Sequence, residues 1–277
     1  MMEWGIVVDS CCDIIPEICD DVKLVSVPLT INLGDRSFSD NEELDMPSFL
    51  EDIKDYQGKI GTAAPAPLLF KDAFVKSCKA FAVTLSSNLS GSYASSLVGQ
   101  ELAQEEGAEV HVFDSKSASA GEVLISLKIG EMIRAGVSKQ TIIEKIDAFI
   151  QQMKTYFVLE NIDTLLKNGR IGKITGKIIT ALNIKPIMGS DGNGNIALFS
   201  HARGEKQTIE KLSDMIRLSG RDMTGECMVI AHCNNITLAE KLKGAIQQRH
   251  SFKDILIVPT RGISSVYAND KGLVLAF

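Results

Sequence analysis

The chain has 277 residues, 45% of them hydrophobic and 23% charged, a composition typical of a globular protein that buries a substantial core. Its 29 basic and 35 acidic side chains give a net charge of -6, and Lys and Arg form no long block, so a nucleic-acid partner is not expected. No apolar run approaches the roughly 20 residues that span a bilayer. The first residues, MMEWGIVVDS, lack the basic and apolar regions of a signal peptide. We therefore expect a cytoplasmic protein without a membrane span.

The cysteines and histidines show no arrangement typical of a metal site or a disulfide framework. The cysteines form no CxxC pair and lack a secretory context, so reduced thiols are expected at positions 11, 12, 19, 78, 227 and 233. The histidines are scattered singly, at positions 111, 201, 232 and 250. No metal or other cofactor is therefore predicted.

The first half of the chain alternates apolar runs of strand length with amphipathic runs of helix length. Strands are predicted at Gly5–Val8, Lys23–Leu29, Phe81–Leu85 and Val110–Phe113. Helices are predicted at Pro47–Tyr56, Leu68–Ser77, Tyr93–Glu106, Glu122–Ala135 and Lys139–Met153. This order favours a parallel sheet with helices on both faces, whose ligands lie beyond the carboxyl ends of the strands.

The second half, from about Tyr156, shows a different pattern of short strands with interspersed helices. The predicted strands are TYFVLE, PIMGS, NIALFS, CMVIAH, DILIVP and LVLAF, and the helices are Glu205–Leu218 and Leu238–Arg249. Gly189 to Gly194 supplies a hairpin turn. We thus predict an α/β protein with an N-terminal parallel-sheet α/β/α domain over residues 1–155 and a C-terminal mixed-sheet α+β domain over residues 156–277. Because no linker marks the border, we expect a large interface with a pocket between the two.

The stretch Ala80–Gln100, AFAVTLSSNLSGSYASSLVGQ, joins a buried strand to a Ser/Gly-rich turn and a helix. The first amides of a helix have no acceptor within the helix and carry the positive end of its dipole, so an anionic group is favoured there. Gly91 lets a ligand approach the backbone closely. Serine also begins many helices without binding a ligand, so a plain N-cap explains this turn equally well when it is taken alone.

Two further strand ends carry similar residues, VVDSCCD at 7–13 and FDSKSASAG at 113–121. Since ligands of parallel sheets lie beyond the carboxyl ends of the strands, these hydroxyl groups should gather on one rim. Asp9 and Asp114 could act as general bases or metal ligands. An acid followed by serine at a strand end more often caps the next helix, and we favour that interpretation.

Enzyme motifs do not fit these residues. Ser90 lies in no GxSxG elbow followed by a plausible Asp and His. GDRSFSD and GSDGNGN match neither a P-loop nor GxGxxG, and the second is typical of a hairpin turn. A hydrolase or transferase therefore ranks below a non-catalytic binding protein.

Taken together, the motifs resemble the DegV family of fatty-acid-binding proteins, whose better-known members are the lipid-carrying subunit of bacterial fatty acid kinase. The resemblance runs nearly end to end, through VVDSCCDI at the start, SFSDNEELDMPSFLEDI at 37–53, TAAPAP at 62–67, SSNLSGSY at 86–93, FDSKSASAG at 113–121, LLKNGRIGK at 165–173 and ARGEKQ at 202–207. Each motif is weak alone, but their order and spacing identify the family.

The resemblance implies that Ser90 of the LSG turn and Thr62 of the TAAPAP segment hold a fatty acid carboxylate. Gly91 and Ser92 of the same turn are expected to be lipid-binding residues as well, and the acyl chain would run into an apolar interior. A structural interpretation remains open for Thr62, which could be a satisfied cap or turn residue. No cofactor is implied beyond the bound long-chain fatty acid.

The resemblance also implies that Arg170 and Arg203 lie near the head group and near a docking surface for a kinase subunit. In purely structural terms, Arg170 could face solvent beside a Gly turn and Arg203 could merely precede a helix. Tyr267 occupies the place where the family commonly has a histidine ahead of a GPG turn. Tyrosine could still donate to a head group, but it does not titrate near neutral pH as histidine does.

A second departure is TAAPAP where the family usually reads TSQPSP, which removes three polar side chains from the rim. The leading hypothesis is a fatty acid carrier that presents its ligand to a separate kinase subunit. The alternative is a lipid-binding sensor or buffer without a kinase partner, and a hydrolase or transferase comes third.

Overall fold

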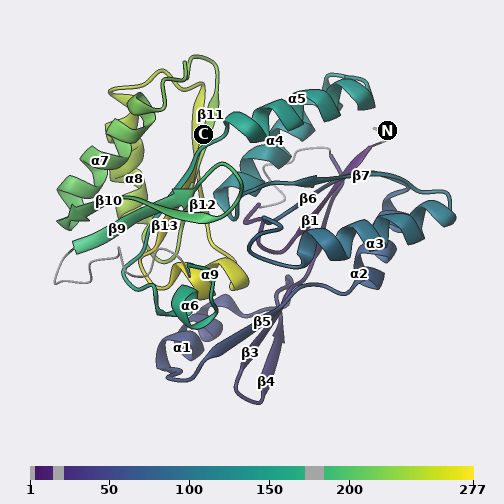
Figure 1. Cartoon of the computed structure of the whole chain (residues 1–277), viewed down its shortest axis with the longest axis horizontal. Coiled ribbons are helices and arrows are strands. Elements are labelled where there is room, and N and C mark those ends of the chain that lie inside the picture. The colour runs from purple at the N-terminus through teal and green to yellow at the C-terminus, as the bar shows by residue number, and fades with distance from the viewer. Residues whose placement is uncertain (1–3, 15–21, 172–183) are drawn as a thin grey trace.

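The computed structural model of the chain describes residues 4–14, 22–171 and 184–277 (Figure 1). Its N-terminal sheet is four-stranded, in the order β2-β1-β6-β7, and all pairs are parallel. The strands are β1 (Gly5–Asp9), β2 (Leu24–Val27), β6 (Lys79–Thr84) and β7 (Glu109–Asp114). All of β1 and nearly all of β6 are buried, as expected for strands covered on both faces.

Helices cover both faces of this sheet. On one face pack α2 (Pro67–Ser77) and α3 (Ser92–Glu105), and on the other α4 (Ala120–Arg134) and α5 (Lys139–Gln152). Ser119 and Glu122 form a capping box at the start of α4, which satisfies amides that have no acceptor within the helix. The predicted parallel sheet with helices on both faces is confirmed.

The C-terminal sheet is six-stranded and mixed, in the order β10-β9-β8-β13-β11-β12. Among the described strands of this sheet, β11 (Cys227–His232) and β12 (Asp254–Pro259) are the one parallel pair. The helix α8 (Ile236–Gln247) connects them along the chain. The antiparallel pairs join β8 (Thr155–Val158), β9 (Ile184–Ser190), β10 (Ile196–Arg203), β11 and β13 (Leu273–Ala276). The predicted mixed sheet is confirmed, and the division into domains at residue 155 stays a prediction.

One helix lies between the two sheets. The buried face of α4 contacts β1 and β6 of the first sheet and β11 and β13 of the second, in one continuous apolar cluster (Figure 1). The outer face of the second sheet is covered by α7 (Gly204–Leu218) and α8. The layers therefore run helix, sheet, helix, sheet, helix, and the shared core holds the two sheets against each other.

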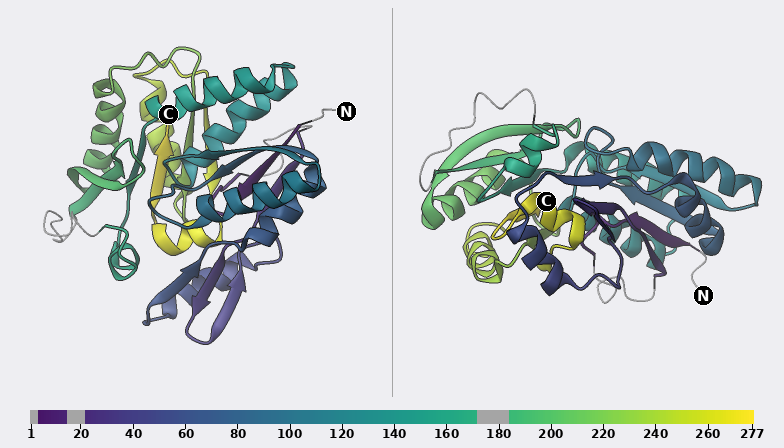
Figure 2. Two further views of the ribbon diagram at one scale, coloured as in Figure 1. Left: turned by 45° about the vertical axis from the view of Figure 1, so that its right-hand side comes forward. Right: turned by 90° about the horizontal axis from the view of Figure 1, so that it is seen from below.

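A small antiparallel sheet was not predicted from the sequence. The predicted strand Lys23–Leu29 is shorter, because β2 ends at Val27 and the chain turns into a second strand. Strands β3 (Thr30–Leu33), β4 (Arg36–Ser39) and β5 (Ile60–Ala63) form a three-stranded sheet in the order β4-β3-β5. Together with α1 (Met46–Asp55) it lies at one end of the molecule (Figure 2). The GDRSFSD segment is its β3–β4 hairpin, in which Gly34 adopts a φ of 62°.

Two short helices complete the described chain, α6 (Asp163–Lys167) and α9 (Gly262–Ala268). None of the helices in the described ranges combines the length and apolar character needed to cross a bilayer.

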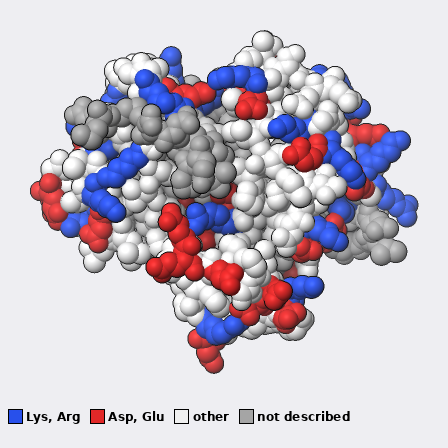
Figure 3. Space-filling view, turned by 180° about the vertical axis from the view of Figure 1, so that it is seen from behind, with Lys and Arg blue, Asp and Glu red and all other residues white. Residues whose placement is uncertain are grey.

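Within the same ranges, no group of His, Cys, Asp and Glu side chains is arranged to hold a metal ion. Cys19 lies outside the described residues, and the described cysteines carry free thiols. Acidic and basic side chains are interspersed on the face shown in Figure 3.

Candidate functional site

A cavity lies between the carboxyl ends of the N-terminal strands, the small sheet and the C-terminal sheet. Residues from the small sheet and the C-terminal sheet, from α6 and α9, and from the turns beyond β1, β6 and β7 line it. Much of its wall is apolar, including Leu29, Leu85, Phe157, Leu165, Ile263 and Val274. The cavity thus lies beyond the carboxyl ends of the parallel strands, where the sequence predicted a ligand.

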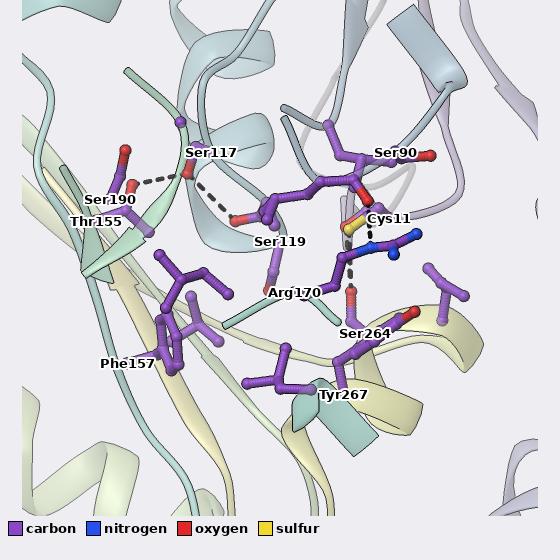
Figure 4. Close-up of a pocket in the computed structure, with 18 of the residues that line it drawn as sticks. Cys11, Ser90, Ser117, Ser119, Thr155, Phe157, Arg170, Ser190, Ser264 and Tyr267 are labelled. Carbon is purple, nitrogen blue, oxygen red and sulfur yellow. Dashed lines mark hydrogen bonds between the residues drawn. The ribbon is translucent and has the colours of Figure 1, made fainter. Parts of the chain in front are cut away.

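One side of the cavity is polar. Thr62 and Tyr267 both line the cavity, and Figure 4 shows Tyr267 on the same side as Ser90 and Arg170. Thr62, on β5, and Tyr267, on α9, place their hydroxyl oxygens 2.9 Å apart. The Asn168 side-chain amide donates to the Tyr267 hydroxyl over 3.4 Å and to the carbonyl of Ile60 over 3.0 Å. We call this group of side chains, with Ser90 and Arg170, the mouth of the cavity.

Arg170 is fixed at the mouth by the backbone. Its Nε donates to the carbonyl of Leu89 over 2.7 Å, and its Nη1 donates to the carbonyl of Asn168 over 2.6 Å. A guanidinium group has five N–H donors, so these two bonds leave donors for a ligand. The side chain is exposed and also lines the cavity. The mouth therefore carries a positive charge beside the turn that contains Ser90.

Ser90 and Gly91 lie in a tight turn between β6 and α3. The amides of Leu89 and Ser90 both donate to the carbonyl of Ser86, over 2.9 and 3.1 Å. The Ser90 hydroxyl oxygen accepts the amide of Ser92, which begins α3, over 3.2 Å. In that bond the Ser90 hydroxyl is an acceptor, so its proton can be donated to a ligand. Gly91 lines the cavity and faces Ala64, since a Cβ at Gly91 would lie 3.7 Å from that of Ala64.

The structure does not place Ser92 or Arg203 at the cavity. The Ser92 side chain is fully buried, and its hydroxyl donates to the Asp9 carboxylate over 2.5 Å. Arg203 is exposed at the end of β10, and its backbone amide bonds the side chain of Gln207. The predicted residues Thr62, Ser90, Gly91, Arg170 and Tyr267 do come together along its lining.

Asp9 holds both ends of the turn that contains Ser90, through Leu85 before it and Ser92 after it. Besides Ser92, it accepts the amides of Cys11 and Leu85, over 3.0 and 2.9 Å. Burial raises the pKa of the Asp9 carboxyl, and the bonds from Ser92, Leu85 and Cys11 act in the opposite direction. Asp114 similarly accepts the amide and hydroxyl of Ser87. Both acids therefore hold turns beyond the strands, and neither accepts a backbone amide from the first turn of α3 or α4, so the predicted capping of the next helix is not observed for these two helices.

Sequence reasoning missed two acids that hold α9. Asp40 accepts the amides of Gly262 and Ile263, over 3.0 and 2.9 Å, and Asp13 accepts the amide of Arg261 over 2.7 Å. These bonds fix the helix that carries Tyr267 against the N-terminal half. The available signal was the position of Asp40 in the motif SFSDNEEL, but nothing in the sequence pairs it with residues more than 200 positions away.

The β9–β10 turn closes another side of the cavity. The Ser86 hydroxyl donates to the carbonyl of Gly194 over 2.8 Å. The side-chain amide of Asn88 donates to the backbone carbonyl of Asn193 over 2.7 Å. The Ser190 hydroxyl donates to the carbonyl of Lys116 over 2.9 Å. The hairpin of the second sheet is therefore bonded to the rim of the first sheet.

Comparisons with known proteins agree with the motifs. The DegV family model matches residues 3–276. A DegV domain-containing protein of Streptococcus pneumoniae is 32% identical over 280 residues, which cover 100% of this chain and 99% of that protein. The crystal structure of a DegV family protein from Ruminococcus gnavus, refined with vaccenic acid, has 37% identity and a TM-score of 0.95, and the match covers 100% of both chains.

A second solved structure is the Streptococcus pneumoniae fatty acid kinase (Fak) B3 protein loaded with linoleic acid. It has 32% identity and a TM-score of 0.92, and the match covers 99% of this chain and 98% of that one. The family match and the fold class thus extend over essentially the whole chain. The chain belongs to the DegV family.

Proposed function

We propose that this chain binds one long-chain fatty acid, with the acyl chain in the cavity and the carboxylate at the mouth, held by Ser90 and Thr62. The observation that carries the proposal is the mouth itself, where the hydroxyl-bearing residues Ser90, Thr62 and Tyr267 line an otherwise largely apolar cavity together with Arg170. The relatives described above support it, because their structures were refined or loaded with fatty acids.

The energetics fit this division of the ligand. Burying about fifteen methylenes at ~0.8 kcal/mol each contributes on the order of 12 kcal/mol before the costs of association, so the tail dominates the affinity. A carboxylate without donors would cost several kcal/mol. Charge-assisted bonds from Ser90, Thr62 and Arg170 offset this cost and fix which end of the ligand faces solvent.

We further propose that the chain presents the carboxylate to a separate kinase subunit for acyl-phosphate formation. Arg170 and Gly91 are exposed at the mouth, so a second protein could reach the head group there. Arg203 would belong to the docking surface rather than to the lipid site, in keeping with its place on the exposed end of β10. The Fak B3 relationship supports this role.

The lipid proposal is tested by purifying the chain from a bacterial host and analysing a denatured extract by mass spectrometry. We expect a fatty acid of roughly 16 to 18 carbons, long enough for the methylene burial estimated above. The matched control is the same extract from the Ser90→Ala, Thr62→Ala double variant, which should contain less fatty acid. An extract of the unchanged chain without any fatty acid would refute the proposal.

The kinase proposal is tested separately, by adding a fatty acid kinase catalytic subunit and ATP to the loaded chain and measuring acyl phosphate. Tyr267 favours the alternative of a sensor or buffer, because tyrosine stands where the family commonly has histidine. If lipid binds but no acyl phosphate forms with the unchanged chain, while Tyr267→His restores it, that alternative is favoured. Acyl phosphate from the unchanged chain would support presentation to the kinase.

A further inference from the structure

A second polar group lies in the cavity, away from the mouth. It consists of Ser117, in the turn after β7, and Thr155, the first residue of β8, with Ser190 beside them (Figure 4). The hydroxyl oxygens of Ser117 and Thr155 are 2.7 Å apart. Their exposed fractions are only 3% and 6%. In the view of Figure 4 they lie on the opposite side from Ser90, Arg170 and Tyr267.

The hydroxyl groups of Ser117 and Thr155 can form more hydrogen bonds than they do in this structure. Two hydroxyl protons are present, and the bond between the two oxygens uses one of them. The acceptor for the second is the carbonyl of Ala118, 3.4 Å from the Ser117 oxygen. That distance is longer than the 2.5–3.0 Å usual for an O–H donor. The pair can therefore still donate one proton and accept others from the cavity side.

Ser190 differs from this pair because its hydroxyl is already satisfied. It donates to the carbonyl of Lys116 and accepts the amide of Gly192, over 2.9 and 3.3 Å. Of these three residues, Ser117 and Thr155 therefore carry the hydroxyl groups that can still bond a ligand.

A saturated acyl chain would meet this wall unfavourably. Methylene groups packed against the Ser117–Thr155 pair exclude water and leave the second hydroxyl proton with only the long bond to the Ala118 carbonyl, which costs free energy. A hydroxyl group on the acyl chain could both donate to one oxygen and accept from the other. The wall therefore matches a ligand with an oxygen in its chain better than a plain hydrocarbon.

We propose that Ser117 and Thr155 form a specificity site for hydroxylated long-chain fatty acids, in which the pair bonds a hydroxyl group carried along the acyl chain. The inference rests on the proposed function, since it requires a fatty acid in the cavity with its carboxylate at the mouth. It adds the class of acyl chain, which the mouth residues do not determine because they contact only the head group.

The test compares stearic acid, oleic acid and octadecanoic acids that carry one hydroxyl group in the middle of the chain. Affinities are measured by displacement of a fluorescent fatty acid from the unchanged chain and from variants. The informative variant is Thr155→Val, which keeps the side-chain shape and removes the hydroxyl. Thr155→Ser restores the hydroxyl, and Thr208→Val makes the same change at a buried threonine of α7, which does not line the cavity.

The quantity to follow is the ratio of the affinity for the hydroxylated acid to that for stearic acid. We expect at least one hydroxyl position to give a ratio of about ten in the unchanged chain, equivalent to about 1.4 kcal/mol. Thr155→Val and Ser117→Ala should bring this ratio towards one, whereas Thr155→Ser and Thr208→Val should keep it.

The outcomes separate this inference from the proposed function. If all the acids bind and the ratio stays near one for every hydroxyl position, or if Thr155→Val keeps a high ratio, the specificity site is refuted and lipid binding stands. A preference for oleic acid over every hydroxylated acid would likewise refute it, in favour of selection by chain shape. If none of the acids binds, the proposed function fails and this inference fails with it.

Discussion

The hydroxyl oxygens of Thr62 and Tyr267 lie 2.9 Å apart although 205 positions separate the residues in the chain. Thr62 belongs to the small antiparallel sheet, and Tyr267 to the short helix beside the C-terminal sheet. Asn168 joins them from the segment after α6. The mouth of the cavity is thus assembled from distant segments, and the predictions below follow from that arrangement.

Removing the mouth hydroxyls should weaken the binding of fatty acids. In Thr62→Ala with Ser90→Ala, the carboxylate loses two donors, each worth roughly 1.5–3 kcal/mol for a charged partner. We expect the dissociation constant for oleic acid to rise by about a hundredfold or more, measured by displacement of a fluorescent fatty acid. Methyl oleate, which lacks the charge, is the control ligand and should be affected less. An unchanged affinity for oleic acid would refute the head-group assignment.

The two arginines should differ in their effects on lipid binding. Arg170→Gln removes the positive charge at the mouth and should weaken oleic acid binding about tenfold, more strongly at low salt. Arg203→Gln makes the same change at an exposed residue outside the cavity and should leave the affinity unchanged. Titrations at two ionic strengths test both variants. If both substitutions weakened oleic acid binding equally, the positive charge of Arg170 would act only through long-range attraction and not through contact with the carboxylate.

Stability should depend on pH through Asp13. Burial raises the pKa of its carboxyl from 3.8 to about 7, and the negative charge of Asp40 adds to this rise, whereas the hydrogen bonds from Ser119 and from the amide of Arg261 act in the opposite direction. Between these two values the folded chain binds a proton that the unfolded chain does not, so this contribution to stability is complete below 3.8 and is lost as the pH rises through about 7.

The measurement compares urea unfolding of the unchanged chain and of Asp13→Asn at several pH values. Asp9 and Glu122 also have raised pKa values, chiefly through burial, but both proteins keep them, so their effects largely cancel in the difference. The stability of the unchanged chain relative to Asp13→Asn should fall by up to about 1.4 kcal/mol per pH unit as the pH rises across this window. Parallel curves would show that Asp13 does not titrate there.

Two glycines in helices should respond in opposite directions to alanine. A Cβ at Gly99 on α3 would lie 2.7 Å from the Cβ of Phe70 and 2.8 Å from the carbonyl oxygen of Pro67, so α2 and α3 would be forced apart. Gly99→Ala should therefore destabilise the fold by about 1–3 kcal/mol. Gly244 on α8 has nothing within 4 Å of such a Cβ, and Gly244→Ala should stabilise by up to ~1 kcal/mol. Urea unfolding of both variants distinguishes these effects.

Much of the fold followed from local sequence. Buried parallel strands such as β1 and β6 appear as short continuous apolar runs, and helices such as α5 show their own period, so these elements were predicted without tertiary contacts. The small sheet was missed because its strands bury few side chains: β3 buries alternate residues, β5 buries one and β4 buries none. Such strands contain too few apolar residues to give a recognisable strand pattern in the sequence.

By itself, the sequence determined the fold class, the family and the segments that supply the mouth, because strand and helix periods and ordered motifs are local properties of the chain. Only the tertiary structure decided which side chains meet. It turned Ser92 inward to Asp9, placed Arg203 away from the cavity, and paired Ser117 with Thr155. Such pairings depend on how the two sheets pack around α4, and no local pattern encodes that packing.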